Sequence, residues 1–324
     1  MKQQYSIREK LFAHLETWRP YTIVWCGLVS LAGACLAYRG VPPLLIFVLS
    51  FFIPLIGWIA SLYASDYLDR DLDAISKPHR PIPSGRIPPK ESLTAGIIFA
   101  LLGLLLSFLL TIYNVLLAII VATLVLTYTR IFKSKGILGN INRGFITIAA
   151  YFFGIFSVTL SLTDIPIYLY FLSIVFLLHD TNSNMIGAIR DIEGDKLGGY
   201  ETFPVKHGIK KSMILSFCLT VSWFVLILSI PFFYQFLSIY FYIIMILDVG
   251  ILVMFYHYLV KTFKNHSRKM ALRYHEFFII ERITLASALL FGVVDPFIAL
   301  MIFVFSMILT LSSQYILRGR FEGI

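Results

Sequence analysis

Two pairs of aspartates, each pair four residues apart, are the side chains in this sequence best suited to chemistry. Asp69 and Asp73 lie in SDYLDRDLDAISKPHRPIPSGR, which spans 65–86, and Asp191 and Asp195 lie in RDIEGDKLGGYETFPVKHG. In a helix, residues four apart lie one turn apart on the same face. The sequence therefore predicts two helical faces that each carry two carboxylates.

Asp66 lies three residues before Asp69 and joins the first face, whereas Asp71 and Glu193 point elsewhere. Like charges stacked on one face repel each other, and burial increases the cost. A positive partner is therefore expected. Mg²⁺ prefers oxygen ligands and binds one or two carboxylates together with water and phosphate oxygens. We expect five residues to bind Mg²⁺ around one diphosphate: Asp66, Asp69, Asp73, Asp191 and Asp195.

Basic residues and a proline accompany each acidic face. Lys77 and Arg80 follow the first face, while Arg190 and Lys196 flank the second. Positioned cations stabilise negative charge that develops on a leaving group. These four side chains are therefore predicted to contact the diphosphate.

Two other interpretations fit a single acidic cluster. It could be a solvated helix end paired with surface cations, or part of a cation transporter. The repeated spacing, and basic residues after both clusters, favour a paired site. Transport sites also tend to lie near the bilayer midplane rather than at helix ends.

The rest of the chain is typical of a membrane protein. It is 58% hydrophobic and 14% charged, against about 25% charged residues in soluble domains. A membrane-spanning helix needs about 20 apolar residues. Ten runs approach this length: 21–38, 44–64, 92–112, 114–130, 137–162, 166–189, 212–233, 236–260, 277–294 and 296–316. The ninth is marginal because it contains Glu281 and Arg282.

Basic residues predict the orientation, because loops rich in Lys and Arg stay in the cytoplasm. They gather before the first run and in alternate loops, at 65–91, 131–136, 190–211 and 261–275. The N-terminus and both acidic motifs are therefore predicted to be cytoplasmic. The net charge of +9 then reflects membrane topology rather than nucleic-acid binding. Ten spans would also place Arg318 and Arg320 inside.

At these residues the chain resembles the UbiA superfamily of intramembrane prenyltransferases. The first motif (65–86) resembles the family pattern N-D-x-x-D-x-x-x-D followed by RPIPSG, and the second (184–208) resembles D-x-x-x-D followed by TFPVKHG. The resemblance implies one domain over 1–324, an all-α bundle of about nine transmembrane helices. Its central cavity would be capped by cytoplasmic loops. It also implies Mg²⁺-dependent prenyl transfer from an isoprenyl diphosphate to an acceptor.

The chain departs from the family pattern at two positions. Ser65 stands where the family has Asn, and a hydroxyl is a weaker metal ligand than an amide oxygen. The family element Tyr-x-x-x-Lys is shifted, since Lys133 comes five residues after Tyr128 rather than four. One residue turns a helix by about 100°, so Lys133 is a weaker candidate for phosphate contact than Lys77 or Arg80.

Two polar residues at membrane depth, Asn184 and Asp180, precede the second motif on its predicted helix and are expected to line the cavity. Their alternative role is hydrogen bonding between helices. The predicted activity is prenyl transfer, within the cell membrane, to an aromatic or other lipid-precursor acceptor. Alternatives are a terpene cyclase that uses the same metal–diphosphate site, and a transporter or non-catalytic scaffold.

Overall fold

The computed structural model describes residues 5–235, 237–263 and 267–323, and most of these are helical. The α-helices are α1 (Ile7–Trp18), α2 (Pro20–Tyr38), α3 (Leu44–Leu68), α4 (Arg70–Ser76), α5 (Pro89–Ser107), α6 (Ile112–Thr127), α7 (Ile137–Val158), α8 (Ile167–Leu197), α9 (Phe203–Ser229), α10 (Ile239–Thr262), α11 (Arg268–Val293) and α12 (Pro296–Glu322). Three short helices are η1 (Tyr128–Phe132), η2 (Leu162–Asp164) and η3 (Ile230–Phe232). β1 (Lys135–Gly136) pairs in parallel with β2 (Glu201–Thr202).

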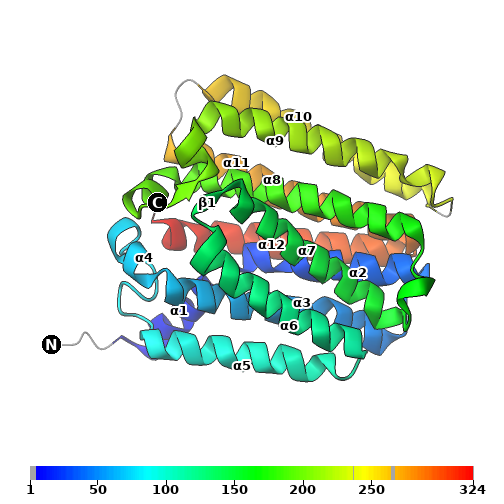
Figure 1. The fold of residues 1–324 in the computed structure, drawn as a ribbon, viewed down its shortest axis with the longest axis horizontal. Coiled ribbons are helices and arrows are strands. Elements are labelled where there is room, and N and C mark those ends of the chain that lie inside the picture. The colour runs from blue at the N-terminus through cyan, green and yellow to red at the C-terminus, as the bar shows by residue number, and fades with distance from the viewer. Residues whose placement is uncertain (1–4, 236, 264–266, 324) are drawn as a thin grey trace.

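Within these described ranges, ten helices of 16 or more residues run side by side in one bundle (Figure 1). Eight are long and apolar enough to cross a membrane. The other two, α8 and α11, carry polar residues at mid-length and pair them with each other. Nε2 of His179 on α8 lies 2.7 Å from Oε2 of Glu281 on α11, and both side chains are buried. The marginal ninth run is thus part of a continuous helix.

Both termini lie at the same end of the bundle, together with α4 and β1 (Figure 1). The backbone oxygen of Phe321, near the end of α12, lies 3.0 Å from Nε2 of His79 in the first-motif loop. An even number of crossings returns the chain to the end where it started. The arrangement therefore agrees with ten spans, the higher of the two predicted numbers.

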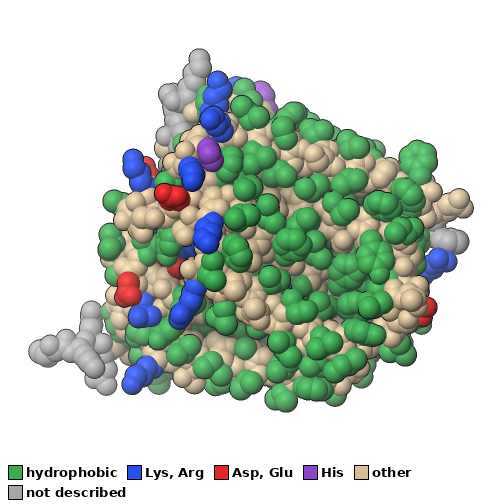
Figure 2. Space-filling view, in the orientation of Figure 1, with side chains coloured by type: hydrophobic (Ala, Val, Ile, Leu, Met, Phe, Trp, Pro, Cys, Tyr) green, Lys and Arg blue, Asp and Glu red, His purple; other side chains and the backbone are tan. Residues whose placement is uncertain are grey.

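The surface is divided as expected for a membrane protein. Hydrophobic side chains cover the long face of the bundle, while Lys and Arg gather mainly at the end that holds the termini (Figure 2). Leu105, Ile246 and Phe305 are among the many apolar side chains that are more than half exposed. Such a continuous apolar face is suited to contact with lipid rather than water.

Helix α2 lies in the middle of the bundle and packs against α3, α7, α11 and α12. Its contact with α7 depends on glycine. A Cβ added to Gly154 would collide with the backbone oxygen of Ser30, and one added to Gly33 would collide with that of Tyr151. Small residues let helix backbones approach closely in membranes. This close packing fixes the positions of α2 and α7, which lie next to the helices that carry the acidic motifs.

Candidate active site

The first motif runs from α3 into α4. The break between these two helices leaves its acidic face intact. α3 ends at Leu68, α4 begins at Arg70, and Asp69 joins them. The backbone N–H groups of Asp69, Asp73 and Lys77 each donate to the oxygen four residues earlier, at 2.8 Å. The helical spacing therefore continues through the break. Asp66, Asp69 and Asp73 all line one cavity.

The second motif lies on the last turns of α8. This helix has 31 residues, so it is about 46 Å long at 1.5 Å per residue and exceeds a hydrocarbon layer of about 30 Å. Its end therefore projects beyond the membrane-spanning part. Asp191 and Asp195 lie on this projecting end and line the same cavity as the first motif.

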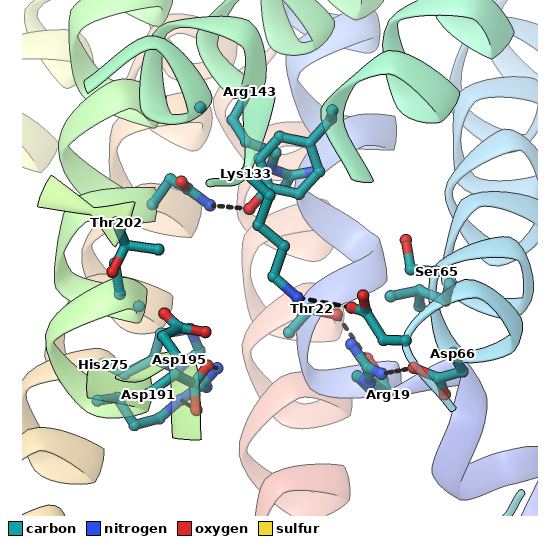
Figure 3. A pocket seen from close by; sticks show the side chains of 18 of the residues that line it. Arg19, Thr22, Ser65, Asp66, Lys133, Arg143, Asp191, Asp195, Thr202 and His275 are labelled. Carbon is teal, nitrogen blue, oxygen red and sulfur yellow. Dashed lines mark hydrogen bonds and ion pairs between the residues drawn. The ribbon is translucent and has the colours of Figure 1, made fainter. Parts of the chain in front are cut away.

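The shared cavity has a volume of about 230 Å³. The second-motif residues Asp191 and Asp195 lie on one side, and Asp66 and Ser65 lie on the other (Figure 3). Twelve of the thirteen predicted site residues line it: Ser65, Asp66, Asp69, Asp73, Lys77, Arg80, Lys133, Asp180, Asn184, Arg190, Asp191 and Asp195. Lys196 does not, because one further residue along α8 turns it outward, where it is exposed.

Basic side chains neutralise the first acidic face. A nitrogen of Arg80 lies 2.8 Å from a carboxylate oxygen of Asp73, and Nζ of Lys133 lies 2.7 Å from one of Asp69. Asp66 is paired with Arg19, which is the left-handed residue between α1 and α2. No motif surrounds Arg19, so its contact with Asp66 could not be predicted from the sequence.

The second face is joined to the first by a lysine. Nζ of Lys77 donates to Asp191 at 2.9 Å, so the first-motif loop reaches the second motif. Arg190 donates to the other oxygen of Asp191 at 2.7 Å and also lies 3.4 Å from Glu322 at the end of α12. These contacts tie α4, α8 and α12 together at the mouth of the cavity.

Lys77 and Lys133 are held in different electrostatic surroundings. Burial and the neighbouring Arg80 lower the pKa of Lys77, although Asp191 acts in the opposite direction. Burial also disfavours the charged form of Lys133, but the carboxylate of Asp69 outweighs it and raises the pKa of Lys133. Lys133 is thus held firmly as a cation inside the cavity.

The position of Lys133 corrects one sequence-based expectation. η1 is a π-helical turn, in which the backbone N–H of Lys133 donates to the oxygen of Tyr128 five residues earlier, at 2.8 Å. Such a turn absorbs one extra residue within a helix. The shifted spacing of Tyr128 and Lys133 therefore still places both in the cavity, and Lys133 is as well placed as Lys77 or Arg80.

Deeper in the cavity, the side chain of Asn184 lies 3.0 Å from the amide of Asn140 and donates to the hydroxyl of Tyr128 at 3.4 Å. Asp180 lies one turn earlier in α8 than Asn184, and its Oδ2 has no hydrogen-bond partner among the described residues. Arg143 and Arg282 also line this part. The cavity is therefore polar well inside the bundle.

The acidic residues are suited to Mg²⁺ only in combination with a substrate. Among the described residues, no three His, Cys, Asp or Glu side chains are grouped closely enough to hold a metal ion alone. Mg²⁺ needs only one or two carboxylates when substrate phosphates and water complete its shell. Facing carboxylates with cations beside them fit an ion that arrives with a diphosphate.

Comparison with known proteins places the chain in a family. The family described as "UbiA prenyltransferase family" matches residues 24–280. The chain belongs to this family. A curated relative, digeranylgeranylglyceryl phosphate synthase of Pyrococcus horikoshii, is 31% identical over 204 residues, which cover 63% of this chain and 72% of the relative.

Solved structures share the fold of this UbiA-family member. One, described as digeranylgeranylglyceryl phosphate synthase in membranes, has a TM-score of 0.64 and 25% identity, and the match covers 88% of this chain and 99% of the other. A UbiA homologue from Archaeoglobus fulgidus, bound to GPP and Mg²⁺, has a TM-score of 0.56 and 16% identity over 94% and 99% of the two chains.

Family membership confirms two predictions from the sequence. The chain is a multi-pass membrane protein, and it is a prenyltransferase. It also excludes the transporter or non-catalytic scaffold that was the second alternative function expected from the sequence. The roles of individual side chains in the cavity follow from the geometry and are proposed below.

Proposed function

We propose that this protein transfers a prenyl group from an isoprenyl diphosphate to a hydroxyl of a glycerol-phosphate lipid precursor, with Mg²⁺ as cofactor. One observation carries the proposal: two sets of carboxylates, interleaved with Lys77, Arg80, Lys133 and Arg190, line one cavity at the end of a membrane bundle. The cavity is proposed to open to the cytoplasm, in keeping with the basic residues at that end.

The relatives support the choice of acceptor. The similar curated proteins are named digeranylgeranylglyceryl phosphate synthase, and the UbiA homologue with the same fold binds GPP and Mg²⁺. A product with two prenyl groups on one glyceryl phosphate requires a singly prenylated glyceryl phosphate as acceptor. An aromatic acceptor, the other class expected from the sequence, has no support among these relatives.

In the proposed reaction, Asp66, Asp69 and Asp73 on one side and Asp191 and Asp195 on the other would hold Mg²⁺, which when bound would neutralise charge on the diphosphate. Lys77, Arg80, Lys133 and Arg190 donate to its oxygens as the bond from C1 to oxygen breaks. The acceptor hydroxyl oxygen forms the new bond to C1, and its proton passes to Asp180, which has a free oxygen. Diphosphate leaves through the mouth.

A product analysis tests this proposal. Purified protein with Mg²⁺ would be given farnesyl, geranylgeranyl or longer diphosphates, with and without a prenylglyceryl phosphate, and diphosphate release and extracted lipids would be measured. We expect release that depends on the acceptor, together with an ether-linked product. Release without acceptor, accompanied by a hydrocarbon or terpene alcohol, would instead identify a cyclase. No release from any donor would contradict the proposal.

A further inference from the structure

Two arginines in the cavity form no direct ion pair with a carboxylate. The cations at the mouth, Arg19, Lys77, Arg80, Lys133 and Arg190, each form an ion pair with a carboxylate. By contrast, Arg143 and Arg282 have no carboxylate oxygen within 4.0 Å in the described part of the chain. The charges at the mouth are therefore balanced by direct ion pairs. In the inner part, Asp180 offsets some of the charge of Arg282, but the cavity lining there holds two arginines and this one carboxylate.

Both arginines are held at the inner part of the cavity by neutral groups. The guanidinium of Arg143, on α7, lies over the ring of Trp58 at 4.3 Å and near Tyr128 at 5.8 Å. Arg282, on α11, is only 5% exposed and donates to the backbone oxygen of Thr22 at 3.4 Å. Its Nε has no hydrogen-bond partner among the described residues.

The two side chains converge on the same place although α7 and α11 are far apart in sequence. The indole N–H of Trp58, beneath Arg143, donates to the hydroxyl of Thr22 at 3.4 Å, and Thr22 is the residue that Arg282 contacts through its backbone. Asp180 attracts the charge of Arg282, and Arg143 repels it. The two positively charged side chains therefore both lie near Thr22.

A buried charge without a direct ion pair, such as that of Arg282, is costly at membrane depth and commonly marks a substrate site. A guanidinium stacked on an aromatic ring keeps its N–H edge free for a planar, bidentate contact with phosphate or carboxylate. Ser183 and Asn140 add polar groups to the same lining. The arrangement fits a second anion that enters beside the diphosphate rather than the diphosphate itself.

We propose that Arg143 and Arg282 form a separate subsite that binds the phosphate of the acceptor and so selects phosphorylated acceptors over neutral ones. This inference rests on the proposed function, since it names the group of the acceptor that is recognised. The acceptor phosphate supplies the negative charge that Asp180 alone does not provide for the two arginines. Its binding there also places the acceptor hydroxyl near Asp180, which lines the same part of the cavity.

The test compares two acceptors, a prenylglyceryl phosphate and the same prenylglycerol without phosphate. The variants are Arg143→Gln and Arg282→Gln, with Arg143→Lys as the charge-conserving change. The matched control is Arg130→Gln, because Arg130 is exposed and lies outside the cavity lining. KM for the acceptor, KM for the prenyl diphosphate and Mg²⁺-dependent binding of the diphosphate would be measured for each protein.

We expect each glutamine variant to raise KM for the phosphorylated acceptor on the order of 10- to 100-fold, the loss that corresponds to a charged hydrogen bond. The preference for the phosphorylated acceptor should fall by the same factor, while KM for the prenyl diphosphate changes less than about threefold. Arg143→Lys should recover part of the loss. Retained diphosphate binding shows that the variants are folded.

Two results would overturn the inference. The variants could keep the full preference for the phosphorylated acceptor, or they could raise KM for the prenyl diphosphate by the same factor, which would assign the arginines to the donor. Failure of the unaltered protein to transfer to the phosphorylated acceptor is a different outcome. It would contradict the proposed function, and with it the acceptor on which this subsite depends.

Discussion

At the scale of single residues, four of the five aspartates expected to bind Mg²⁺ are each paired with a basic side chain: Asp66, Asp69, Asp73 and Asp191. The five aspartates could be chosen from sequence because a spacing of four residues survives in any helix. Their partners could not all be chosen in this way. Arg19 meets Asp66 only after α1 and α2 fold against α3, and no local pattern records that contact.

Lys133 offers a prediction at this scale. Lys133→Met should remove one cation from the diphosphate and leave Asp69 without its 2.7 Å partner. We expect kcat/KM for the prenyl diphosphate to fall on the order of 100-fold, as when a single group that stabilises the transition state is lost. Steady-state kinetics on purified protein would measure it.

Lys135→Met is the control for this change, because Lys135 lies two residues further on and is exposed. It should keep nearly full activity. Equal activity of the two variants would show that Lys133 has no special part in binding the diphosphate.

At the scale of elements, three departures from regular helices shape the site: the break at Asp69, the π-turn of η1 and the long end of α8. The hydrophobic runs predicted most helices well. The hydrophobic runs could not predict the π-turn, because one extra residue in a helix does not change the hydropathy of the segment. They also gave no sign that α12 returns to the cavity, since contacts between distant segments depend on packing.

The end of α12 can be tested with one aromatic side chain. The ring of Phe321 lies 4.1 Å from the guanidinium carbon of Arg19 and 4.2 Å from that of Arg80. A desolvated contact of this kind contributes about 2 kcal/mol. Phe321→Ala should therefore loosen both arginines and raise KM for the prenyl diphosphate roughly threefold to tenfold.

The control is Phe297→Ala, which removes the same side chain at the opposite end of α12, where Phe297 is 68% exposed. KM should stay unchanged in this variant. If Phe321→Ala also left KM unchanged, the end of α12 would have no part in donor binding.

The contact between α2 and α7 predicts an effect on stability. Gly154→Ala places a Cβ against the backbone of Ser30, and overpacking of this kind costs about 1–3 kcal/mol. Gly250→Ala, which meets nothing within 4 Å, should be neutral or slightly stabilising because alanine favours helix. Thermal unfolding in detergent should give a lower Tm for the first variant only; equal Tm values would contradict the close packing.

At the scale of the whole molecule, the bundle has ten long helices in its described part and both termini at one end (Figure 1). Composition predicted a polytopic all-α bundle, and basic residues favoured the even number of spans. The family resemblance alone suggested nine. The pairing of His179 with Glu281 explains why a run with two charges still forms a complete helix.

Orientation can be measured with single cysteines. We expect a membrane-impermeant thiol reagent to label Thr163→Cys, between α7 and α8, in intact cells. Ser267→Cys and Arg320→Cys, at the end that holds the termini, should be labelled only after permeabilisation. The parent protein without added cysteine is the control. Labelling of Arg320→Cys in intact cells would contradict ten spans.

The central claim is that two acidic faces, 122 residues apart in sequence, act together on one diphosphate. It is tested most directly by Mg²⁺-dependent prenyl transfer in Asp69→Asn and Asp191→Asn, with Asp71→Asn as control because the Asp71 side chain is 88% exposed. We predict that each of the first two variants loses at least about 100-fold in rate while remaining folded and inserted, and that the control stays active. Full activity in either Asp69→Asn or Asp191→Asn would contradict the claim.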